Sequence, residues 1–67
     1  MIKIKIAIRF KNNMVVVFDE EGKRIPKYQG QYEEVKESAL RDAPPDAVFA
    51  HGFTDFGELR IVPREEW

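Results

Sequence analysis

The sequence contains no cysteine, a single histidine and only four glycines, none of them adjacent to another, among its 67 residues. Without cysteine, neither disulfides nor a thiolate metal site can hold the chain together. Isolated glycines do not make a phosphate-binding loop. No apolar run approaches the roughly 18–20 residues that a membrane-spanning helix needs, and the charged N-terminal stretch is unlike a signal peptide. We therefore expect a soluble cytoplasmic protein without cofactors or membrane contact.

An excess of charge of one sign is also lacking, because 11 Lys and Arg residues stand against 12 Asp and Glu residues, for a net charge of −1. Proteins that bind duplex nucleic acid usually carry a clear basic excess, so the balance disfavours that class. The length predicts one domain over residues 1–67, with a stability margin of roughly 3–5 kcal/mol. Formation of a homodimer is one way to widen this margin.

The first eleven residues alternate between two kinds of side chain. Every even position from Ile2 to Phe10 is large and apolar, whereas positions 3, 5, 9 and 11 are Lys or Arg and only Ala7 interrupts the series. This period of two predicts a strand with one buried face and one basic, solvent-exposed face. We expect the isoleucines to point into the core and Lys3, Lys5 and Arg9 to point outward.

A second strand over 14–18 closes a hairpin with the first. A three-residue loop, with Asn13 in the left-handed conformation, pairs Ile8 with Val16 and Ile6 with Phe18. The alternative two-residue turn at Asn12 and Asn13 sets Asp19 against an isoleucine on the core face. We favour the three-residue loop, which also places Lys5 opposite Asp19.

The remaining elements follow in order along the chain. Asp19–Gly22 has the composition of a turn, and 23–25 is long enough for a short returning strand. Apolar residues at helical spacing predict a helix over 31–43, which Pro44 and Pro45 end. Strands are expected at 48–53 and 58–62 with a turn between them. The order predicts a small ββαββ domain of the α+β class: one mainly antiparallel four-stranded sheet with a single helix on one face.

A single helix covers only one face of such a sheet, so the composition of the other face matters. A four-residue loop pairs Phe53 with Glu58. Phe49, His51 and Phe53 then lie on one face of the sheet, and the small residues of the same strand lie on the other face. Because Ala50 and Gly52 would let a helix approach closely, we expect them to lie inside. The predicted helix-free interaction face then contains Lys3, Lys5, Arg9, Val15, Val17, Phe49, His51, Phe53 and Arg60.

Candidate chemistry is sparse. His51, Asp55 and Glu58 are too few for a metal site of ordinary affinity, which has three or four ligands and often several His or Cys. Thr54 and Asp55 beside His51 have the composition of a turn, and no nucleophile has a recognisable base nearby. We therefore expect neither a catalytic nor a metal site, and not an enzyme.

Two binding functions remain open. The first is a protein-interaction or self-association module, possible because monomers seldom leave a large apolar patch in water. Trp67 either joins the core or anchors a partner. The alternative is a single-stranded nucleic-acid binder, in which the basic residues follow the phosphates while Phe49, Phe53 or Phe56 stack on bases.

Overall fold

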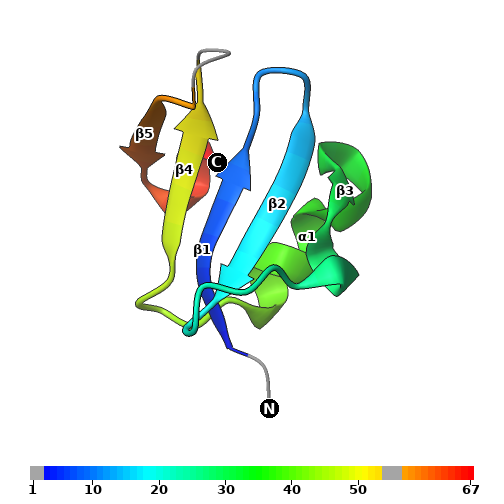
Figure 1. Cartoon of the computed structure of the whole chain (residues 1–67), viewed down its shortest axis with the longest axis vertical. Coiled ribbons are helices and arrows are strands. Elements are labelled where there is room, and N and C mark those ends of the chain that lie inside the picture. The colour runs from blue at the N-terminus through cyan, green and yellow to red at the C-terminus, as the bar shows by residue number, and fades with distance from the viewer. Residues whose placement is uncertain (1–2, 54–56) are drawn as a thin grey trace.

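A five-stranded mixed sheet carries one helix on one of its faces (Figure 1). The computed structural model describes residues 3–53 and 57–67. The strand order is β3-β2-β1-β4-β5, and all neighbours are antiparallel except β1 and β4, which run parallel. The elements are β1 (Ile4–Arg9), β2 (Met14–Asp19), β3 (Gly30–Gln31), α1 (Tyr32–Asp42), β4 (Val48–Gly52) and β5 (Leu59–Val62).

The α+β class and the single helix agree with the prediction, whereas the sheet differs from it in two details. β3 adds a fifth strand that pairs with the outer edge of β2, and its two residues are too few to show a periodic pattern in sequence. The parallel pair arises because the chain passes from β2 through α1 to the far side of β1, where β4 runs in the direction of β1.

The first hairpin has the predicted three-residue loop. Phe10 donates its backbone N–H to Met14 O at 2.8 Å, and Asn13 has a φ of 67°. Ile8 pairs with Val16, and Ile6 pairs with Phe18, as expected. Asparagine tolerates this left-handed conformation better than most residues, and glycine is not required here.

A bulge at Lys5 breaks the alternation of β1 and corrects one prediction. The register shifts between Ile4 and Ile6, so that Ile4, and not Lys5, lies opposite Asp19. The extra residue reverses the direction of every side chain before it. Ile4 therefore joins the buried core on the same side as Ala7, whereas Ile6 and Ile8 point to the opposite face.

The segment after β2 and the helix agree closely with expectation. Gly22 closes the turn with a φ of 81°, and the short strand expected at 23–25 is reduced to a single bridge between Phe18 and Arg24. α1 ends immediately before Ala43, as the two following prolines require. Within the described ranges 3–53 and 57–67, no helix has the length and apolar character to cross a membrane.

The second hairpin has the predicted register, but its buried face was assigned wrongly. Phe53 donates to Glu58 O at 3.2 Å, and His51 pairs with Arg60. Phe49, however, is only 2% exposed and lies in the core beneath the helix. Gly52 instead faces the Phe10 ring: a Cβ there would lie 2.9 Å from Phe10 Cδ1. The Phe10 side chain, and not α1, therefore occupies the space that Gly52 leaves.

Trp67 belongs to the core, which decides between the two roles considered for it. Its side chain is 3% exposed and packs edge-on against Phe49 and Tyr32, with ring centroids 5.0 and 5.6 Å away. The indole Nε1–H donates to Ala50 O at 3.1 Å. Trp67 thereby covers the part of the sheet that α1 does not reach.

Candidate functional site

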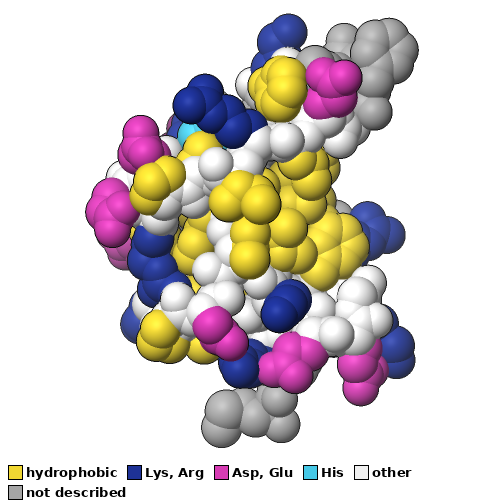
Figure 2. Space-filling model, turned by 90° about the vertical axis from the view of Figure 1, so that its left-hand side faces the viewer, with side chains coloured by type: hydrophobic (Ala, Val, Ile, Leu, Met, Phe, Trp, Pro, Cys, Tyr) yellow, Lys and Arg dark blue, Asp and Glu magenta, His cyan; other side chains and the backbone are white. Residues whose placement is uncertain are grey.

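The face of the sheet opposite α1 is apolar across its middle, and we call it the open face. Strand register places apolar side chains of β1, β2, β4 and β5 on it, while Arg24, paired with Phe18, and Gln31, paired with Met14, lie at its outer edge. Ile61 is 74% exposed and Leu59 is 43% exposed. Figure 2, seen from the β5 side, shows hydrophobic side chains gathered across the middle of the molecule with charged groups around them. The open face consists of Ile6, Ile8, Phe10, Val16, Phe18, Val48, Ala50, Gly52, Leu59 and Ile61.

The predicted interaction face is therefore corrected in its apolar part. Val15, Val17 and Phe49 are 0%, 0% and 2% exposed and pack under α1. The assignment failed because both faces of these strands are apolar, so that alternation alone cannot say which one meets the helix. One signal was present in the sequence: the uninterrupted run Met14–Phe18 is typical of a strand that is covered on both faces.

The basic residues of the first strand are separated in space, and one of them, Lys3, is paired with carboxylates. Lys3 lies 3.4 Å from a Glu20 carboxylate oxygen and 3.6 Å from one of Asp46. Lys5 is exposed, as predicted, and lies at the bulge. Because Arg9 lies near the other end of the strand, the three residues do not form a continuous basic track.

Arg9 is partly buried, in contrast to the prediction, and fastens three segments together. Its Nε and Nη2 donate to Asn13 Oδ1 at 3.2 and 3.0 Å, and its Nη1 donates to Trp67 O at 3.2 Å. The guanidinium also lies 3.6 Å from the centroid of the Tyr32 ring, and the Tyr32 hydroxyl donates to Trp67 O at 2.7 Å. These contacts hold the hairpin loop, the helix start and Trp67 in one arrangement.

Four of the predicted residues do come together, at the carboxyl ends of β1 and β4. Arg9, His51 and Arg60 lie side by side across β1, β4 and β5, and we call them the basic row. His51 is half-buried, and its Nε2 is shielded from solvent without a hydrogen-bond partner among the described residues. Phe53, 52% exposed, follows His51 by two residues.

A groove of about 410 Å³ opens beside the basic row. The described residues that line it come from the end of β1, the first hairpin loop and the end of β4, and no Asp or Glu is among them. The volume falls in the range of ligand sites, about 300–1,000 Å³. The lining consists of Arg9, Phe10, Lys11, Asn13, His51, Gly52 and Phe53.

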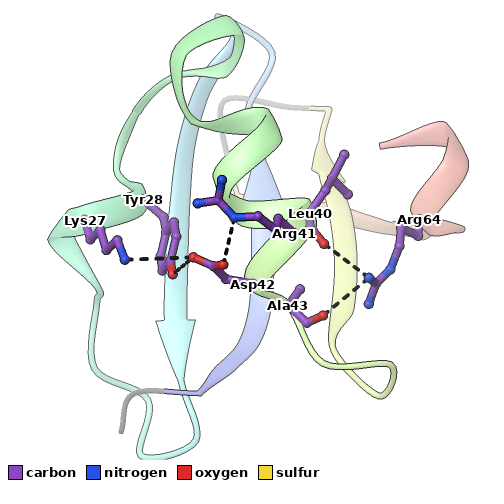
Figure 3. A network of polar contacts seen from close by, with 7 residues as sticks. All are labelled: Lys27, Tyr28, Leu40, Arg41, Asp42, Ala43 and Arg64. Carbon is purple, nitrogen blue, oxygen red and sulfur yellow. Dashed lines mark hydrogen bonds and ion pairs between the residues drawn. The ribbon is translucent and has the colours of Figure 1, made fainter.

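A polar network fixes the C-terminal end of α1 (Figure 3). The Tyr28 hydroxyl donates to Asp42 Oδ2 at 2.5 Å, and Arg41 and Lys27 pair with the same carboxylate. Burial, together with the hydrogen bond to Asp42, raises the pKa of Tyr28 to about 12. The hydrogen bond from Tyr28, followed by that from Arg41, lowers the pKa of Asp42.

Arg64 completes this network from the other side of the helix end. Its guanidinium donates to the carbonyl oxygens of Leu40 and Ala43, each at 3.4 Å (Figure 3). It also donates to the Pro44 carbonyl oxygen at 2.6 Å. The last carbonyls of a helix lack intrahelical partners, so a cation at this position satisfies them. The network holds structure together and is not directed at a ligand.

Within the part of the chain that the structure describes, no group of three His, Asp or Glu side chains converges in a manner suited to a metal ion. Thr54, Asp55 and Phe56, which the sequence marked as a turn and as a possible stacking residue, lie outside the described residues, as does Ile2. Comparison with known protein families, with curated proteins and with solved structures gives no significant match.

Proposed function

We propose that this protein is a non-enzymatic self-association module, in which the open face packs against the open face of a second copy. The observation that carries the proposal is the apolar composition of that face. A sheet with one solvated side normally alternates apolar and polar residues, whereas the middle of this sheet, across β1, β2 and β4, is apolar on both sides. Monomers seldom leave a large apolar surface in water, so a second protein surface is expected to bury this one.

A second copy suits the open face better than a charged partner does. A twofold dimer places the same surface against itself, and the apolar middle of the open face brings no like charges together. Two sheets can then pack about 10 Å apart, with the helices on the outside. Two of the basic residues that a nucleic acid would need have partners within the fold, Lys3 with carboxylates and Arg9 with Asn13 and Trp67, and Lys3, Lys5 and Arg9 do not form a continuous track. We therefore do not propose the nucleic-acid alternative.

The size of the face sets the expected strength of the dimer. Strands β1, β2, β4 and β5 have 6, 6, 5 and 4 residues, and at about 3.3 Å per residue and about 4.8 Å between strands they give a flat area of roughly 330 Å² per copy. The relief of the side chains raises the accessible area, so the pair buries about 1,000 Å², near the lower limit for specific interfaces. We expect a dimer that forms and dissociates with concentration.

The test is the variant Ile61→Lys, compared with the wild type by sedimentation velocity over about a hundredfold range of concentration. Complete burial of an Ile side chain contributes about 1.5–3 kcal/mol. With Ile61 74% exposed in the single chain, two copies lose about 2–4 kcal/mol, or roughly 30- to 1,000-fold in affinity. The fold itself should be unaffected, which circular dichroism checks.

Gln29→Lys is the matched control, because it introduces the same charge at an exposed position next to the buried Tyr28 on the helix-covered side. The control should dimerise like the wild type. Because the interface is apolar, added salt should leave the association unchanged, whereas ionic contacts weaken with salt. A wild type that stays monomeric at every concentration would sink the proposal.

A further inference from the structure

The groove lies at a place in the sheet where two chain connections diverge. β1 and β4 are the parallel pair among the described strands, so their carboxyl ends meet at the same edge of the sheet. From there β1 turns toward β2 on one side and β4 turns toward β5 on the other. Parallel strands whose connections part in this way leave a crevice, and open α/β sheets bind ligands in such crevices.

The charge around the groove is of one sign. Lys11 and the basic-row residues Arg9 and His51 line it, and Arg60 continues the row beyond His51. Lys11 and Arg60 form no ion pair within residues 3–53 and 57–67, in contrast to Lys3 at the other end of β1. In a chain of net charge −1, the cationic side chains of Arg9, Lys11 and Arg60, with no Asp or Glu in the groove lining, form a local positive field.

Part of this cationic wall is held in place before any ligand arrives. Arg9 is anchored by Asn13 and by Trp67 O, and these bonds use three of the five N–H groups of its guanidinium. His51 is half-buried and contributes to the groove wall, and its Nε2 is shielded from solvent without a partner among the described residues. Buried polar atoms are rarely left unpaired, so this nitrogen is a feature in need of an explanation.

The other walls of the groove are aromatic. Phe10 packs over Gly52 on one side, where the absent side chain gives it room, and Phe53 is half exposed on the other. Flat apolar walls beside a cationic edge suit a ligand with a planar apolar body and an anionic group.

We infer that this groove is a binding site for a small organic anion that carries a planar or aromatic group. The carboxylate, or an equivalent anionic group, accepts hydrogen bonds from Lys11 and the exposed N–H groups of the basic row. Charge-assisted bonds of this kind are stronger than neutral ones. The planar body lies between the two phenylalanines. The groove borders the open face, with which it shares Phe10 and Gly52, whereas its cationic residues Arg9 and Lys11 lie outside that face.

The experiment is a titration of the isotope-labelled full chain, followed by amide and imidazole NMR shifts, with three probes. Benzoate has both the ring and the charge, benzamide has the same shape without the charge, and inorganic phosphate has charge without the ring. We expect saturable shifts at Lys11, His51 and Phe53 with benzoate. Benzamide and phosphate should each bind at least about tenfold weaker, since a charge-assisted bond or the ring contact is lost.

Variants assign the binding to the groove. Lys11→Gln and His51→Gln should each weaken benzoate binding about three- to tenfold, whereas Lys5→Gln, which removes the same charge at the far end of β1, should leave it unchanged. Ile61→Lys should also bind benzoate normally, because Ile61 does not line the groove, and this variant distinguishes failure of the groove from failure of the proposed dimer. Equal binding of benzoate and benzamide, or shifts centred on Val16 and Ile61, would overturn the inference.

Discussion

Replacement of Trp67 tests how the core of this small fold is closed. Trp67 is 3% exposed, packs against Phe49 and Tyr32, and donates a hydrogen bond to the buried Ala50 carbonyl. Trp→Ala changes in a core cost about 3–5 kcal/mol, and a domain of this size has roughly 3–5 kcal/mol in total. We therefore expect Trp67→Ala to be largely unfolded.

Trp67→Phe separates packing from hydrogen bonding. The smaller ring retains most of the contact with Phe49, but the Ala50 carbonyl loses its donor, and an unsatisfied buried acceptor costs about 1–3 kcal/mol. Each kcal/mol lowers the melting temperature of a domain of this size by about 4–8 °C. The variant should fold and melt at a correspondingly lower temperature.

The assay is urea unfolding followed by far-ultraviolet circular dichroism, at one fixed protein concentration because dimerisation would itself add stability. In the wild type, the fluorescence of Trp67, the only tryptophan, reports the same transition. Unfolding midpoints within error of the wild type for Trp67→Ala would refute the role assigned to this side chain in closing the core.

Two further predictions concern local interactions. Asn13→Gly keeps the left-handed turn but loses two hydrogen bonds from Arg9, and Asn13→Ala also strains the φ of 67°. The free energy of unfolding, measured with urea, should therefore fall in the order Asn, Gly, Ala, by about 1 kcal/mol per step. In the Tyr28–Asp42 pair, the pKa of Tyr28 is raised, so its contribution to the free energy of unfolding is fully present below pH 10 and is lost as the pH rises through about 12. Because the pKa of Asp42 is lowered, its carboxylate contributes to the free energy of unfolding above pH 3.8, and this contribution is lost as the pH falls further. Tyrosinate absorbance should show the Tyr28 pKa returning toward 10 in Asp42→Asn, and an unchanged titration would contradict this assignment.

Local patterns of the sequence determined most of the secondary structure and, apart from the bulge at Lys5, both hairpin registers. The left-handed Asn13, the end of α1 before Pro44, and the pairing of His51 with Arg60 all follow from turn chemistry and from matching apolar positions. These features depend on residues close together in the chain, so short-range rules describe them.

Only the tertiary structure decided which face of the sheet meets the helix. Ala7, Val17 and Phe49 on one face and Ile8, Val16 and Ala50 on the other are equally suited to burial, and the bulge at Lys5 moves Ile4 from one face to the other. The packing of α1 and of the distant Trp67 selects the first face, and the basic row gathers beside a groove only because β4 lies parallel to β1. Alternation shows which residues of a strand share a face. The face on which the helix packs depends on contacts between residues far apart in the chain.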